Sequence, residues 1–131
     1  MAGYSGTPLI RKLGIKEGFR CFYFQPPGSY AGDLGKLPSG VRVEARLSGE
    51  LDFIHAFFDD VKAFRSELPR LQARLKKTGM LWISWRKGKV SDLSETIVRT
   101  TGLEAGLVDV KICAVDDVWS GLKFMFRLKD R

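Results

Sequence analysis

The stretch that decides the fold is "LDFIHAFFDDVKAFRSELPRLQARLKKTGMLWISW", residues 51–85. Its first eight residues are apolar on both faces, as in a strand buried at the centre of a sheet. From Asp60 the apolar residues recur at intervals of three and four, which is the period of an amphipathic helix. A second buried strand, Met80–Trp85, ends the stretch. Strand, helix and strand in this order predict two parallel strands joined by a crossover helix.

Three features mark the limits of this expected helix. Asp59 or Asp60 can cap its start, and Gly79 can end it. Pro69 lies inside it and has no N–H to donate, and its ring crowds the preceding turn. We therefore expect a kink or a break near Glu67–Leu68.

The flanking sequence supplies further elements of both types. The expected strands are Arg20–Phe24, Val41–Leu47, Leu107–Val115 and Leu122–Leu128, and the expected helices are Pro8–Leu13 after a Thr7 cap, a turn at Tyr30–Leu34 and a segment capped by Asp92. Val41–Leu47 alternates apolar and polar residues, which indicates a strand near an edge with one wet face. The whole pattern predicts one α/β domain over residues 1–131. We expect a Rossmann-like three-layer sandwich of about six strands, mostly parallel, with a C-terminal antiparallel hairpin.

The composition narrows the class of protein. No apolar run approaches the roughly 18 residues that span a bilayer, and the first residues lack the apolar core of a signal peptide. We therefore expect a cytoplasmic protein without a membrane contact. The chain has one histidine and two cysteines that lie far apart, so no metal-ligand spacing exists and no metal is expected.

The chain is basic, with a net charge of +7. Two local clusters contribute: Arg74, Lys76 and Lys77, and then Arg86, Lys87 and Lys89. A basic balance favours polyanions, so nucleic-acid binding is one alternative function. No helix-turn-helix, zinc or RNA-recognition signature supports it, and solvated surface charge is the simpler interpretation.

The C-terminal part of the chain resembles the class I S-adenosylmethionine-dependent methyltransferases, whose sheet also ends in an antiparallel hairpin. The resemblance covers roughly residues 49–128, with "LDFIHAFFDD" similar to their fourth strand and "GMLWISWRK" to their fifth. The N-terminal half departs from the family pattern. After the first strand, "QPPGSY" replaces a glycine-rich turn, and the expected second strand ends at Arg46 and Leu47 without an acid for the ribose. We therefore predict no cofactor, with S-adenosylmethionine disfavoured.

A second resemblance covers the whole chain. "MAGYSGTPLIRKLGI", "LWISWRK" and "GLVDVKICAVDDVWSGLKFMFR" are similar to segments of a family of short bacterial proteins of unknown function. This family supplies no activity to carry over.

Topology nevertheless predicts where a ligand would bind. The carboxyl ends of parallel strands collect at one edge of a sheet, and a hairpin after such a strand turns over at that edge. The residues expected there are Trp85, Arg86, Lys87, Asp116, Trp119 and Ser120, with Tyr4, Ser5 and Thr7 beside them. Two aromatic faces with nearby cations suit a small anionic or nucleotide-like ligand.

Other reactive side chains have simple structural explanations. Asp59 and Asp60 are more readily helix caps than an acid/base pair, and His55 is expected to be a hydrogen-bonded core histidine. Cys113 and Ser120 lack the partners of a nucleophile. No catalytic constellation remains. We predict a non-catalytic binding or regulatory module, present as a monomer or homodimer, with a methyltransferase-like enzyme using an unusual cofactor pocket as the first alternative.

Overall fold

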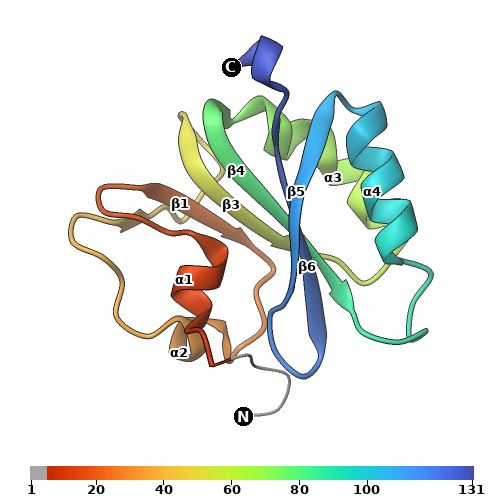
Figure 1. Cartoon of the computed structure of the whole chain (residues 1–131), viewed down its shortest axis with the longest axis horizontal. Coiled ribbons are helices and arrows are strands. Elements are labelled where there is room, and N and C mark those ends of the chain that lie inside the picture. The colour runs from red at the N-terminus through yellow and green to blue at the C-terminus, as the bar shows by residue number, and fades with distance from the viewer. Residues whose placement is uncertain (1–5) are drawn as a thin grey trace.

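The computed structural model describes residues 6–131 (Figure 1). The elements in chain order are α1 (Leu9–Leu13), β1 (Arg20–Phe24), α2 (Tyr30–Leu34), β2 (Arg42–Val43), β3 (Leu51–Phe57), α3 (Val61–Ala73), β4 (Leu75–Arg86), α4 (Glu95–Glu104), β5 (Leu107–Ala114), β6 (Trp119–Phe126) and a 3₁₀ turn at Leu128–Asp130. The six strands form one sheet in the order β2-β1-β3-β4-β6-β5. Strands β2, β1, β3 and β4 are parallel, and β6 is antiparallel to both β4 and β5. The predicted α/β fold, with its parallel sheet and terminal hairpin, is confirmed.

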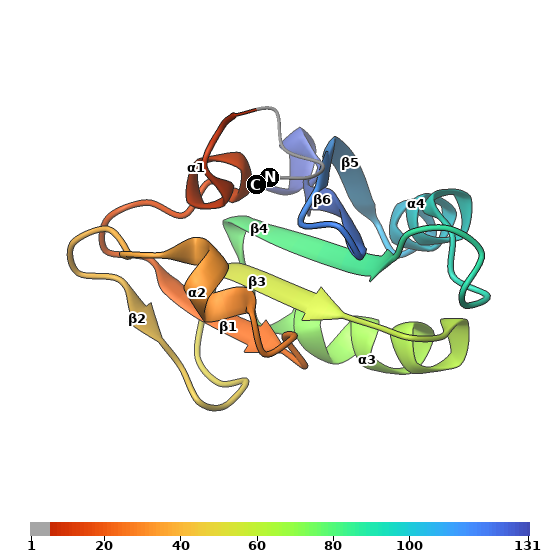
Figure 2. The ribbon, with the colours of Figure 1, turned by 90° about the horizontal axis from the view of Figure 1, so that it is seen from below.

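Helices cover both faces of the sheet. Helices α1 and α2 lie on one face, and α3 and α4 lie on the other (Figure 2). Each face has its own core, with Leu13 and Trp82 on the α1/α2 side and Phe64 and Leu81 on the α3/α4 side. The indole N–H of Trp82 donates to the carbonyl of Leu13 at 2.9 Å, so α1 is fixed to the centre of β4.

Helix α3 starts where the sequence predicts and continues where a break was expected. Asp60 is its N-cap, and the Asp60 carboxylate accepts the N–H of Ala63 at 2.7 Å. The helix runs through Pro69 without interruption. A proline inside a helix deprives the carbonyl four residues earlier of its donor, here that of Arg65. The packing of Leu68 and Leu71 against the sheet, both buried, outweighs that loss.

Several boundaries differ from the prediction. Helix α3 ends at Ala73, and Gly79 lies inside β4, which begins at Leu75 rather than at Met80. At Gly79 a Cβ would lie 2.9 Å from the Leu51 carbonyl, so this glycine permits the close pairing of β3 and β4. The second strand is only Arg42–Val43 instead of Val41–Leu47.

Two predicted caps are replaced by neighbouring residues. Pro8, not Thr7, is the N-cap of α1, and it makes no side-chain cap bond. Ser94 caps α4 and accepts the N–H of Ile97, whereas the Asp92 carboxylate accepts the N–H of Val61 at the start of α3. Asp92 therefore joins the loop before α4 to the start of α3. None of the helices in residues 6–131 is long and apolar enough to cross a bilayer.

Candidate functional site

The parallel strands β1, β3 and β4 end at one edge of the sheet, the lower edge in Figure 1, where the chain also turns from β5 into β6. The main chain joins these parts directly. The N–H of Lys87 donates to the carbonyl of Val118 at 2.7 Å, and Arg86 is opposite Trp119 in the β4–β6 pair. The structure thus brings Arg86, Lys87 and Trp119 together, as the order of elements predicts.

Arg86 makes two interactions at this edge. Its Nε lies 2.7 Å from Oδ1 of Asp59, the residue beyond Phe58 at the end of β3. Its guanidinium lies 4.5 Å from the centre of the Trp119 ring, a cation–π distance. The cation is therefore held between a carboxylate and an aromatic face, and it ties the ends of β3, β4 and β6 together.

Asp116 has a structural role in the turn between β5 and β6, and Ser120 lies in β6 just after it. The Asp116 carboxylate accepts the N–H groups of Val118 and Trp119, both at 2.8 Å. Such a bond from an Asp side chain to the main chain two residues on is a standard way to build a turn. Ser120 is half-buried and lies opposite Trp85 in the ladder. Asp116 is thus a turn former rather than a free carboxylate.

The two tryptophans do not form the expected joint aromatic rim, which corrects that part of the prediction. Trp85 and Trp119 are each only 6% exposed and belong to the cores on opposite faces of the sheet. The register explains this, since Trp85 is opposite Ser120 while Trp119 is opposite Arg86, and adjacent pairs in a ladder point to opposite faces. Trp119 packs edge-to-face on Phe57 at 5.2 Å. A ligand at this edge would meet Arg86 before it met either indole.

The N-terminal residues of the predicted site are only partly described. Thr7 is exposed and precedes the Pro8 cap. Tyr4 and Ser5 lie outside the described residues, so their part in the site stays a prediction.

The turn after β1 is strained. Gln25 has φ of 52°, and it is the one non-glycine residue at positive φ within residues 6–131. Such conformations are costly and cluster at functional sites. Pro26 and Pro27 follow, and they contribute no N–H groups. A Cβ at the exposed Gly28 would meet no atom within 4 Å, so open space lies beside this turn before α2 begins.

An acid does follow β2, which sequence reasoning missed. Because β2 ends at Val43, the next residue is Glu44. The predicted strand extended to Leu47 and hid it. The Glu44 carboxylate lies 3.2 Å from Nε of Arg20, at the start of β1. This ion pair directs Glu44 away from the carboxyl edge.

A buried chain of hydrogen bonds supports the β1 turn from within the core. The Tyr30 hydroxyl, from the first residue of α2, lies 2.8 Å from Nδ1 of His55, and His55 Nε2 lies 2.7 Å from the Ser84 hydroxyl. All three residues are buried. Burial lowers the pKa of His55 from 6.5 to about 3, so the imidazole is neutral at physiological pH. The core histidine is as expected, but its partners could not be read from the sequence because they lie 25 and 29 residues away.

Neither cysteine is an activated thiol. Burial raises the pKa of Cys21 to about 12 and also raises that of Cys113, although three lysines near Cys113 oppose the second effect. Such thiols remain protonated and unreactive. No group of metal-ligating side chains occurs within residues 6–131.

The two basic clusters lie at opposite ends of the same strand. Lys76 and Lys77 are near the start of β4, and Arg86 and Lys87 are at its end. Lys76 pairs with Asp52 at 3.2 Å, and Lys77 lies over the Phe126 ring. The sequence clusters therefore do not form one continuous basic stripe along this strand. Nucleic-acid binding stays a prediction based on net charge.

The comparisons agree on the fold. The chain is similar to the ribosomal protein L11 methylase of Lactobacillus delbrueckii subsp. bulgaricus, with a TM-score of 0.63 and 14% identity over 91% of this chain and 75% of that one. It is also similar to magnesium protoporphyrin IX methyltransferase from Synechocystis PCC 6803 with bound SAH, with a TM-score of 0.58 and 10% identity over 91% and 78% of the chains. A SAM-dependent methyltransferase from Aquifex aeolicus gives 0.57 and 20% identity over 91% and 88%. No family model and no curated protein matches the sequence.

The chain therefore has a methyltransferase-like Rossmann fold. The resemblance to short bacterial proteins stays a prediction, since no family model matches. The prediction of no cofactor was wrong: structures of the same fold hold bound SAH in the Synechocystis enzyme and natively bound S-adenosylmethionine in fibrillarin from Aeropyrum pernix. These neighbours share the fold expected for the methyltransferase-like alternative.

Proposed function

We propose that this protein is methyltransferase-like in function and binds S-adenosylmethionine at the carboxyl edge of its sheet, beside the turn formed by residues 25–29. The observation that carries the proposal is the left-handed Gln25 directly after β1. In this fold class the tight turn after the first strand is the place where the main chain approaches a nucleotide-like ligand. Here a non-glycine residue makes that turn in spite of its conformational cost.

The residues present fit a ligand beside the turn. Gly28 is exposed and leaves room for close approach. Ser29 is the N-cap of α2, but its side chain accepts no hydrogen bond from an N–H of that helix. Its hydroxyl can therefore bond to a ligand without giving up a cap bond. The exposed side chains of Gln25 and Ser29 supply neutral polar groups, which suit the hydroxyl and amino groups of such a cofactor.

Two features set the site apart from the standard pattern. Pro26 and Pro27 remove two main-chain donors, so Gly28 and Ser29 supply the remaining N–H groups. Glu44 stands after β2, where an acid usually meets ribose hydroxyls, but its carboxylate pairs with Arg20. Val43 is opposite Cys21, four residues before Gln25, so Glu44 lies beside the start of β1 and not beside the turn. We therefore expect binding weaker than in an enzyme with a glycine-rich turn and a free acid.

When bound, S-adenosylmethionine supplies an electrophilic methyl group. The chain's own contribution is to orient the ligand and to select the acceptor. Arg86 is the last residue of β4, Lys87 and Lys89 lie just beyond it, and Lys89 is exposed. Cations at this edge attract an anionic acceptor. We propose a small anion or a nucleotide-like molecule as the methyl acceptor.

Calorimetric titration of the purified protein with S-adenosylmethionine and S-adenosylhomocysteine tests the proposal. We expect saturable binding with a Kd below about 100 μM for at least one of them. The variant Gly28→Leu should weaken that binding at least about tenfold, because it fills the open space without a clash inside the fold.

The matched control is Thr100→Leu on the exposed surface of α4, across the sheet from the turn. This variant adds a leucine side chain of the same size, and it should leave the affinity unchanged. Both variants should keep the melting temperature of the parent protein. Absence of heat with both ligands, or equal affinity of Gly28→Leu and the parent, would overturn the proposed site.

A further inference from the structure

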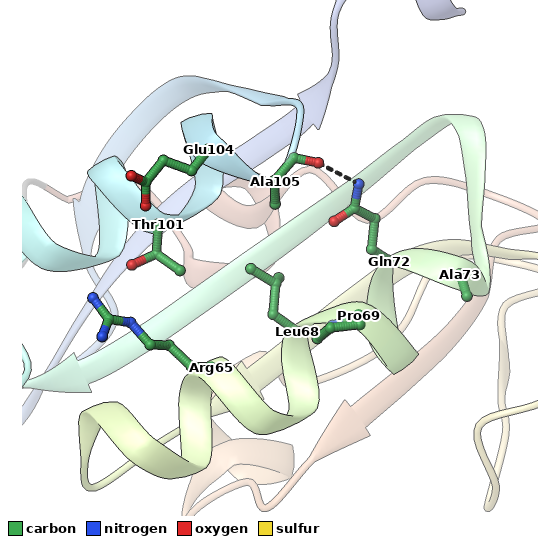
Figure 3. A pocket seen from close by; sticks show the side chains of 8 residues that line it. All are labelled: Arg65, Leu68, Pro69, Gln72, Ala73, Thr101, Glu104 and Ala105. Atoms are coloured by element: carbon green, nitrogen blue, oxygen red, sulfur yellow. Dashed lines mark hydrogen bonds between the residues drawn. The ribbon is translucent and has the colours of Figure 1, made fainter.

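A groove between α3 and α4 lies on the face of the sheet opposite α1 and α2 (Figure 3). Its volume is about 650 Å³, and its lining residues are Arg65, Leu68, Pro69, Gln72, Ala73, Thr101, Glu104 and Ala105. We name it the α3–α4 groove. A single hydrogen bond crosses it in Figure 3, from Nε2 of Gln72 to the carbonyl of Ala105 at 2.9 Å. The volume is in the range of small-molecule sites.

The middle of the groove is apolar. Leu68 forms the floor and is 3% exposed, Pro69 and Ala105 lie near it, and Ala73 lies toward the other end of the groove. These side chains offer no hydrogen bonds. They suit an aliphatic or aromatic group of a ligand.

One end of the groove carries a cation, a carboxylate and a hydroxyl that have no ion-pair or hydrogen-bond partner in the described part of the chain. Arg65 from α3 and Glu104 from α4 reach toward the same end, with the Thr101 hydroxyl between them (Figure 3). Within residues 6–131 neither charged group makes an ion pair. The Thr101 hydroxyl oxygen is buried and has no hydrogen-bond partner in the same part of the chain. A buried hydroxyl without a partner is rare and calls for an explanation.

We propose that the α3–α4 groove binds a free α-amino acid with an apolar side chain. Arg65 pairs with the carboxylate of the ligand. The Thr101 oxygen is buried in the free protein, so its side chain turns about χ1 to donate to the same group. Glu104 accepts from the ammonium group. The apolar side chain of the ligand lies along Leu68 and Pro69.

Ligands with only one of these features satisfy the groove less well. A simple anion would meet the carboxylate of Glu104, and a simple cation would meet the guanidinium of Arg65. A wholly apolar ligand would bury Thr101 further and leave its hydroxyl unpaired. A zwitterion with an apolar side chain satisfies both charges, the hydroxyl and the floor. The inference does not depend on cofactor binding, because none of the lining residues belongs to the turn after β1.

The test is an NMR titration of the full chain with L-leucine, L-methionine and L-phenylalanine as probes. We expect saturable amide shifts confined to α3 and α4 for at least one of them. N-acetyl-L-leucine lacks the ammonium group, and L-leucinamide lacks the carboxylate. Each analogue should bind at least about tenfold more weakly than L-leucine, if leucine is the binding probe, because one charge pair is lost. The acetyl and amide derivatives of methionine or phenylalanine serve in the same way.

Two variants assign the charges. The affinity of Arg65→Gln for the amino acid should be about the same as the affinity of the parent protein for the amide. Arg65→Gln should bind the amide no more weakly than the parent does. Glu104→Gln should behave in the same way toward the acetyl derivative. The matched control is Arg70→Gln, which removes the same charge from an exposed residue of α3 that pairs with Glu67 outside the groove. It should bind like the parent.

The proposal fails if none of the three amino acids gives saturable shifts up to about 10 mM. It also fails if both analogues bind as well as the amino acid, a comparison that needs only the parent protein. Loss of binding in Arg70→Gln equal to that in Arg65→Gln would likewise overturn it, since general charge would then be the cause.

Discussion

Lowering the pH should destabilise this protein through His55 in particular. The imidazole is completely buried and lies between Tyr30 and Ser84 at hydrogen-bond distance. Burial lowers its pKa from 6.5 to about 3 in the folded chain. The unfolded chain therefore takes up the proton first as the pH falls, so the contribution of His55 to stability is complete above pH 6.5 and is lost progressively below it.

The magnitude follows from the distance between the pH and the unfolded pKa. At about pH 4.5, two units below 6.5, the loss is about 2.7 kcal/mol, because each unit corresponds to about 1.4 kcal/mol. That is a large share of the 5–15 kcal/mol typical of a folded domain, on the order of a third. Carboxylates also titrate in this range, so the total loss needs a reference without the imidazole.

His55→Gln supplies that reference, since an amide can bond with both neighbours but does not titrate. Urea unfolding of the two proteins is measured between about pH 7.5 and 4.5, by circular dichroism and by tryptophan fluorescence. The latter includes the emission of Trp82, whose ring centre lies 6.3 Å from that of His55. The difference in free energy of unfolding should fall by about 1.4 kcal/mol per unit below pH 6. Tyr30→Phe keeps the imidazole, so it should lose about 1 kcal/mol at every pH while keeping the slope. A difference curve that stays flat down to pH 4.5 would refute the reasoning.

Two further predictions concern the packing and capping of the helices. Gly102→Ala should lower the free energy of unfolding by about 1–3 kcal/mol, because a Cβ there would lie 2.2 Å from the Phe124 ring. The control Gly32→Ala, in the open part of α2, should be neutral or stabilising. Equal melting temperatures for the two variants would contradict this prediction. Asp60→Ala should cost about 1 kcal/mol because the cap of α3 is lost. Asp59→Ala should cost less than about 0.5 kcal/mol, because its pair with Arg86 is exposed; chemical denaturation that gives the opposite order would exclude capping as the main role of Asp60.

The sheet could be predicted because its central strands carry their own signal. Residues 53–57 of β3 and 80–85 of β4 are largely apolar runs, and a run buried on both faces fits only the middle of a covered sheet. The length of the edge strand β2 was predicted wrongly, because an alternating pattern does not show which residues pair with a neighbouring strand. Residues 41–47 alternate, yet only Arg42 and Val43 form a ladder with β1. The local sequence pattern therefore predicts the central strands better than the edge strand.

The candidate site depended on contacts that sequence spacing does not contain. The order of elements was enough to place Arg86, Lys87 and Trp119 at one edge, since topology alone brings strand ends together. The order of elements does not predict the direction in which each side chain points. Trp85 and Trp119 point to opposite faces because of a register that is set by pairing across 34 residues, and no local pattern reports it. The left-handed Gln25 carries no sequence signal at all, because glutamine rarely adopts that conformation.

The hydrogen bonds of the buried His55 account for the stability of the strained turn after β1. A glycine-rich turn holds its shape through residues that adopt left-handed conformations at little cost, whereas Gln25 adopts one at a cost. Such strain persists only where the surroundings over-determine it. Tyr30 starts the helix immediately after this turn, and its hydroxyl is tied through His55 on β3 to Ser84 on β4. The core thus fixes the far end of the turn, and β1 fixes the near end. A methyltransferase-like fold can in this way keep a defined turn at the carboxyl edge of its sheet without a glycine-rich sequence.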